Sequence, residues 1–141
     1  MKCLGLLGAD AIDATAAYGR ILSAEMRHRF GYGNDTRLVM LNLQTPELST
    51  AVGKQDFPAA CALLNLGAEQ LVALGATAVV ACTSSLQPVA ERLSLNVPLL
   101  SMTAAVGTAL QTLKIKRVLR VSMFKNRVLH KEQIVEFRKA F

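Results

Sequence analysis

A cysteine followed by three hydroxyl residues is the strongest candidate for chemistry in this chain. The stretch "VVACTSSL", Val79 to Leu86, runs from small and β-branched residues into Cys82, Thr83, Ser84 and Ser85. A thiolate is an effective base and nucleophile where its surroundings favour the charged form. Hydroxyl residues after a strand are also typical helix caps. The stretch therefore predicts either a capped helix start or a site where Cys82 acts on a small polar molecule.

The elements that would position Cys82 alternate between short apolar runs and helical segments. Strands are predicted over residues 2–8, 37–43, 76–82, 97–102 and 116–123, with a loop over residues 44–50. Strands separated by helices favour βαβ units and a parallel sheet that is covered on both faces. We therefore expect an α/β, flavodoxin-like parallel sheet of about four or five strands with helices on both faces.

Two helices carry more specific predictions. The first follows the opening strand, ends before "GYGN", and has an apolar spacing of Ile12, Ala16, Ile21 and Met26. Asp56 is predicted to cap a later helix that Gly75 closes. The apolar stripe of that later helix consists of Phe57, Cys61, Leu64, Ala68 and Leu71.

In a parallel sheet, ligands bind at the carboxyl ends of the strands. This rule brings the segment Gly8, Ala9 and Asp10 to the same edge as residues 43–45 and 82–84. The first segment lacks the glycines of a dinucleotide-binding fingerprint, so it predicts a tight strand-to-helix turn. Asp10 and Asp13 fit helix-start residues better than a catalytic carboxylate pair.

Composition limits the classes of function. The chain has 141 residues, of which 52% are hydrophobic and 18% charged, as expected for a packed globule. Its net charge of +6 arises in residues 114–141, which hold nine Lys/Arg against two Glu, so the folded body shows no nucleic-acid signature. No apolar run is long enough for a membrane helix, and the amino terminus does not predict a signal peptide. Three unpatterned cysteines favour free thiols in a reducing cytoplasm, and no Cys/His cluster predicts a metal site.

Four segments in order resemble the aspartate/glutamate racemase family. "MKCLGLLGADAIDAT" resembles the family's opening strand and turn, with matches at Gly8, Ala14 and Thr15. "LGAEQLVALGATAVVACTSSL" is similar to the helix and strand that lead into the family's Cys-Asn-Thr, placing Cys82 on the cysteine and Thr83 on the asparagine. "VPLLSMTAAVGTAL" and "LKIKRV" resemble the strand, helix and strand that follow. The resemblance covers residues 1 to 119, which we expect to form a racemase-like α/β lobe.

The resemblance implies cofactor-independent racemisation of an amino acid of the aspartate or glutamate type, with no pyridoxal phosphate. Family members remove the Cα proton with one cysteine and return a proton from the opposite face with a second, one from each of two lobes. Cys82 would be the catalytic acid/base. The substrate would be held by Gly8, Ala9, Asp10, Thr83 and Ser84.

The sequence departs from this family pattern after about residue 119, where it is truncated or divergent. Residues 120–141 read as a basic, helical C-terminal extension, and we expect no second lobe with its cysteine within these 141 residues. Cys3 would lie roughly 17 Å from the carboxyl edge, and Cys61 belongs to a packed stripe, so neither replaces it. Without a second lobe, apolar surface of the first lobe would be exposed. We therefore expect a homodimer that covers this surface. The alternative function is a catalytically silent lobe that binds a small anion or a protein partner.

The catalytic interpretation sets a condition on the structure. The sulfur of Cys82 must stand at an accessible edge of the sheet, because a thiol sealed in the interior cannot reach a substrate carbon.

Overall fold

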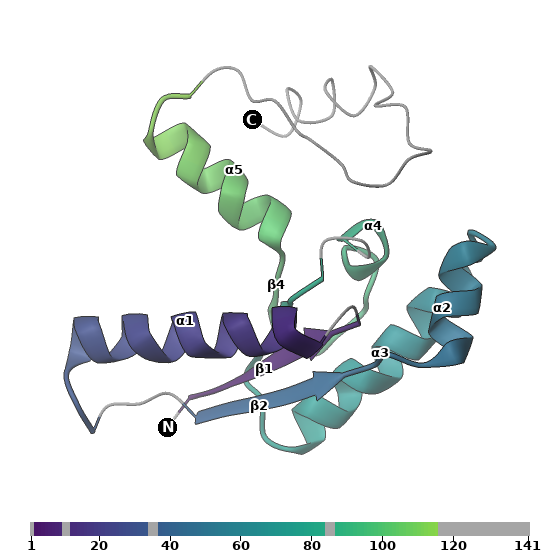
Figure 1. The fold of residues 1–141 in the computed structure, drawn as a ribbon, viewed down its shortest axis with the longest axis horizontal. Coiled ribbons are helices and arrows are strands. Elements are labelled where there is room, and N and C mark those ends of the chain that lie inside the picture. Colours follow the sequence, from purple (N-terminus) through teal and green to yellow (C-terminus); the bar gives the residue numbers. More distant parts are fainter. Residues whose placement is uncertain (1, 10–11, 34–36, 84–86, 116–141) are drawn as a thin grey trace. The chain divides into compact units, whose positions relative to one another are not determined.

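A four-stranded parallel sheet with the strand order β2-β1-β3-β4 organises the chain (Figure 1). The computed structural model describes residues 2–9, 12–33, 37–83 and 87–115. The strands are β1 (Cys3–Gly8), β2 (Arg37–Asn42), β3 (Ala78–Ala81) and β4 (Leu99–Leu100). The helices are α1 (Ile12–Phe30), α2 (Pro46–Gly53), α3 (Phe57–Ala73), α4 (Gln87–Ala90) and α5 (Met102–Thr112). The α/β class and the parallel sheet predicted from the sequence are confirmed.

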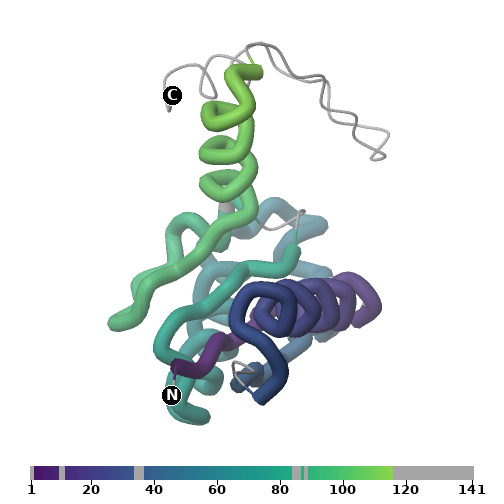
Figure 2. The backbone as a smooth tube through the Cα atoms, turned by 90° about the vertical axis from the view of Figure 1, so that its left-hand side faces the viewer, coloured from purple at the N-terminus to yellow at the C-terminus, as the bar shows by residue number. Residues whose placement is uncertain are grey.

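The chain divides into two compact units, Met1–Thr103 and Ala104–Phe141. The first unit contains the sheet, α1 to α4 and the start of α5. In the second unit, the structure describes the remainder of α5, drawn in green in Figure 2, and the few residues after it. The predicted strand over residues 116–123 and the predicted basic extension over residues 120–141 lie outside the described residues.

The main core lies on the face of the sheet that α3 covers. Leu7 of β1 and Val79 of β3 are buried against Leu64 and Leu71 of α3. On the other face, Gly19 of α1 lies so close to β1 and β2 that a Cβ there would be 3.0 Å from Met40 Sδ. Because helices cover both faces, consecutive β1 residues are buried, as is typical of parallel sheets.

The buried stripe of α1 differs from the predicted one. Thr15 and Gly19 are the buried residues of α1, whereas Ile12 and Ile21 are each 64% exposed. The prediction was wrong because it ranked positions by hydrophobicity. Close approach of α1 to the sheet instead selects small side chains for the contact.

The segment after β2 is also helical, although it was predicted as a loop. Thr45 caps α2 by accepting a hydrogen bond from the Leu48 amide at 3.2 Å, and Pro46 occupies the first turn, where its missing N–H is tolerated. The predicted cap of α3 is confirmed, since Asp56 Oδ1 accepts from the Ala59 amide at 3.1 Å. Gly75 follows α3 with a φ of +95°, a left-handed conformation that favours glycine.

Candidate functional site

The ends of β1 and β3 meet at the point where the strand order reverses. From β1 the chain passes to β2 on one side, then returns to place β3 and β4 on the other side. In open α/β sheets this switch point is the usual position of a ligand site, since the connections diverge there. The Cys82 amide donates to the Leu7 carbonyl at 2.8 Å and so extends the pairing of β3 with β1 beyond Ala81. Cys82 thus lies beside Gly8 at this edge.

Next to Gly8, a polar side-chain contact joins α1 to β2. Thr15 Oγ1 donates a hydrogen bond to Asn42 Oδ1 at 3.1 Å, and Thr15 is only 2% exposed. Gly8 pairs with Asn42 across the sheet. A Cβ on Gly8 would overlap both Thr15 Oγ1 and Asn42 Oδ1. Glycine is therefore required here because the helix and the neighbouring strand occupy the space of a side chain.

Cys82 itself is buried and held as a neutral thiol. The residue is 3% exposed, and its Sγ donates a hydrogen bond to the Val80 carbonyl at 3.5 Å. Burial raises the pKa of the thiol to about 12, because the thiolate would lose its hydration. At neutral pH the side chain is thus a proton donor. This conformation does not give the sulfur the accessibility that the catalytic interpretation requires.

Tyr18 brings a second weak acid towards the same edge. Its hydroxyl donates to Met102 Sδ at 3.2 Å, which links α1 to the residue that begins α5. Burial raises the pKa of Tyr18, and negative charge on Cys82 raises it further. The phenol and the thiol therefore interact electrostatically, and ionisation of one opposes ionisation of the other.

The backbone on both sides of Cys82 is held by Gln87. The Nε2 group of Gln87 donates to the Ala81 carbonyl at 3.2 Å and to the Thr83 carbonyl at 2.7 Å. Gln87 is 6% exposed, and its Oε1 is a buried acceptor with no partner in the structure. The orientation of the amide follows from these contacts, since only the NH₂ end can donate to two carbonyls.

The structure brings several predicted site residues together and leaves others elsewhere. Gly8, Cys82 and Thr83 lie at the carboxyl edge, with Thr83 2% exposed, and Ala9 is half-buried beside them. Asp10 and Ser84 lie outside the described residues. Cys3 begins β1 and is therefore at the opposite end of the strand. Cys61 is half-buried on α3, where its Sγ contacts the Arg92 carbonyl at 3.8 Å. All three cysteines are free thiols.

Four residues at this edge were not predicted as site residues from the sequence. They are Thr15, Tyr18, Asn42 and Gln87. Thr15 was noted only as a match in the family resemblance, and the other three were given no role at the site. Their contacts join residues far apart in the chain, such as Tyr18 with Met102, and no local spacing signals such pairs.

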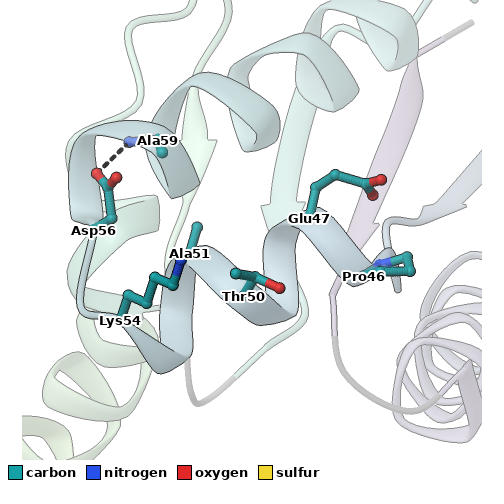
Figure 3. Close-up of a pocket in the computed structure, with 7 residues that line it drawn as sticks. All are labelled: Pro46, Glu47, Thr50, Ala51, Lys54, Asp56 and Ala59. Atoms are coloured by element: carbon teal, nitrogen blue, oxygen red, sulfur yellow. Dashed lines mark hydrogen bonds between the residues drawn. The ribbon is translucent and has the colours of Figure 1, made fainter.

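A shallow pocket of about 430 Å³ lies between α2 and α3 (Figure 3), and Cys82 is not among the residues that line it. Its polar lining includes Glu47, Thr50, Lys54 and Asp56. The Asp56 carboxylate is already engaged as the cap of α3, as the dashed line in Figure 3 marks. Within the described ranges, no group of three His, Cys, Asp or Glu side chains can hold a metal ion, and no helix there could cross a membrane.

Comparison with solved structures finds chains of similar fold, among them the following two. An Asp/Glu racemase candidate from Yersinia pestis is 26% identical, with a TM-score of 0.75 over 82% of this chain and 51% of that chain. An aspartate racemase homologue from Pyrococcus horikoshii OT3 is 19% identical, with a TM-score of 0.66 over 79% of this chain and 50% of that chain. This chain thus spans about half the length of both. No protein-family model and no curated protein matches the sequence.

Proposed function

We propose that this chain is a lobe of a cofactor-independent amino-acid racemase in which Cys82 is an acid/base for the Cα proton. The observation that carries the proposal is the position of Cys82 beside Gly8, at the switch point of a sheet whose fold matches racemase homologues. The proposed substrate is a small amino acid of the aspartate or glutamate type.

Racemisation requires the Cys82 side chain to react both as a thiolate base and as a thiol acid. The Cα–H of an amino acid is a very weak acid, so a thiolate base must take the proton while the electron pair delocalises into the substrate carboxylate. Return of a proton to the opposite face of Cα completes inversion. With a pKa of about 12, Cys82 at neutral pH is in the form that donates. Abstraction requires a local opening, and a nearby substrate ammonium group would favour the thiolate.

A second copy of the chain is the proposed source of the opposite acid/base. The chain spans about half of each matched structure. Large apolar side chains are exposed on α1 and β2, including Ile12, Ile21 and Met40. A homodimer would cover such surface. Sedimentation equilibrium tests this directly, and a monomer at concentrations that support activity would contradict it.

One observation favours a second function, that of a catalytically silent lobe. Cys82 is 3% exposed and hydrogen-bonded to its own strand, which is how a structural thiol in a core behaves. Such a lobe would bind a small anion or a protein partner through the same edge of the sheet.

Hydrogen exchange at the substrate Cα separates the two functions. Purified protein is incubated in D₂O with L-aspartate or L-glutamate, and the α-proton signal is followed by NMR with optical rotation in parallel. The proposal expects exchange in the wild type, retained in Cys61→Ser and lost in Cys82→Ser. Exchange with inversion indicates two working acid/bases, and exchange with retention indicates one. The absence of exchange with both substrates contradicts the proposal and supports the silent lobe.

A further inference from the structure

The contacts of Gln87 point to a role that packing does not explain. Its Nε2 bridges the carbonyls of Ala81 and Thr83, the residues that precede and follow Cys82. The bridge spans six residues to Ala81 and four to Thr83, so it joins the start of α4 to the end of β3. A single side chain thereby holds the backbone at the residue before the thiol and at the residue after it.

The oxygen end of the Gln87 amide indicates that the N–H donors of this side chain, and not its oxygen, give it its role. Gln87 Oε1 is buried and has no hydrogen-bond partner in the structure. A buried acceptor without a partner lowers stability, and replacement by an apolar side chain of the same shape would remove that penalty. An apolar residue would fill the volume equally well. What it would lose is the pair of N–H groups that hold the Cys82 backbone.

We infer that Gln87 is a positioning residue that keeps Cys82 in its buried orientation and so controls the reactivity of the thiol. Its importance for proton transfer rests on the proposed function, whereas its effect on the thiol does not. When the bridge is intact, Cys82 Sγ remains at the Val80 carbonyl. When the bridge is absent, the backbone at Cys82 and Thr83 is released and the sulfur gains access to solvent.

The test is the rate of Cys82 alkylation by iodoacetamide in the folded full-length protein, followed by peptide mass spectrometry. Gln87→Met keeps the length of the side chain and removes both donors. Gln70→Met is the matched control, because Gln70 is exposed on α3. Cys3 serves as an internal reporter of global unfolding, since it is 3% exposed at the opposite end of β1.

The inference expects Cys82 in Gln87→Met to react at least about tenfold faster than in the wild type or in Gln70→Met, with Cys3 unchanged. The increase of the Cys82 alkylation rate with pH should also begin at a lower pH in Gln87→Met than in the wild type, because a solvated thiol ionises more readily. An unchanged Cys82 rate overturns the inference. Equal acceleration of Cys3 and Cys82 also overturns it, because Gln87 then supports only the overall fold.

A measurement on the wild-type protein covers the case in which Gln87→Met does not fold. The side-chain NH₂ protons of Gln87 are held by two carbonyls, so their exchange with water should be much slower than that of Gln70. Equal exchange rates for the two amides would overturn the inference. Neither measurement uses an amino-acid substrate, so failure here and failure of the proposed racemisation are distinguishable.

Discussion

The Cys82 amide and the Leu7 carbonyl, joined by a hydrogen bond of 2.8 Å, place the backbone of Cys82 directly beside the end of β1. This contact brings together two segments that are 75 residues apart in the sequence. Gln87 adds α4 to the surroundings of Cys82, and Tyr18 adds α1. Four predictions test these surroundings and the elements that maintain them.

Gly8→Ala should destabilise the protein by about 1–3 kcal/mol, the usual cost of forcing an extra group into a packed site. The added methyl group would overlap Thr15 Oγ1 and Asn42 Oδ1 and would separate the two hydrogen-bonded side chains. Urea unfolding followed by circular dichroism measures the change in free energy of unfolding. Gly53→Ala is the control, because nothing lies within 4 Å of a Cβ at that position. Equal stability of the two variants would show that the close approach at Gly8 is absent in solution.

Alkylation of Cys82 in the wild type should keep rising with pH well above the range of an ordinary thiol. Burial raises the pKa of Cys82 from 9.0 to about 12, so the thiolate fraction increases about tenfold per pH unit up to that value. The rate is measured between pH 8 and about pH 11 by mass spectrometry of the Cys82 peptide. Half-buried Cys61 in the same samples provides the comparison. A Cys82 rate that levels off near pH 9 would contradict a buried thiol.

The same raised pKa makes the folding stability depend on pH. The folded protein retains the Cys82 proton more strongly than the unfolded chain does. The stability that this proton binding contributes is complete below pH 9 and is lost as the pH rises towards 12. Urea unfolding at several pH values should therefore show a steeper alkaline loss of stability in the wild type than in Cys82→Ser. Parallel pH dependences in the two proteins would be inconsistent with this linkage.

Asp56→Ala should lower the free energy of unfolding by about 1 kcal/mol, as expected for loss of a helix cap. The Asp56 carboxylate satisfies the Ala59 amide in the first turn of α3, the helix that covers the main core. Thermal or urea unfolding measures the effect. Asp56→Asn keeps an acceptor oxygen and should recover most of the stability. If Asp56→Asn is as unstable as Asp56→Ala, the loss arises from charge rather than from the capping hydrogen bond.

Local sequence patterns were sufficient for the order of elements and for several of their boundaries. The Asp56 cap, the Gly75 helix end and the buried residues Leu64, Ala68 and Leu71 of α3 are all marked by residue types or spacings within a few positions of the chain. The alternation of apolar strands with helices was likewise enough to predict a parallel sheet, because parallel neighbours require crossover connections.

Hydrophobicity patterns did not predict which face of a helix is buried where small residues make the contact with the sheet. The buried face of α1 contains Thr15 and Gly19, which no hydrophobic period marks. Their burial follows from the closeness of α1 to β1 and β2, which is a property of the assembled sheet. The α2 helix was missed for a related reason, since its Thr45 cap and Pro46 are equally typical of a loop.

The sequence by itself determined the fold class and the position of Cys82 at a strand end. Only the tertiary structure decided the state of that thiol, which is buried, protonated and bracketed by the contacts of Gln87. The reason is physical: the ionisation of a side chain depends on the water and polar groups around it. At Cys82 these surroundings come from segments that only folding brings together.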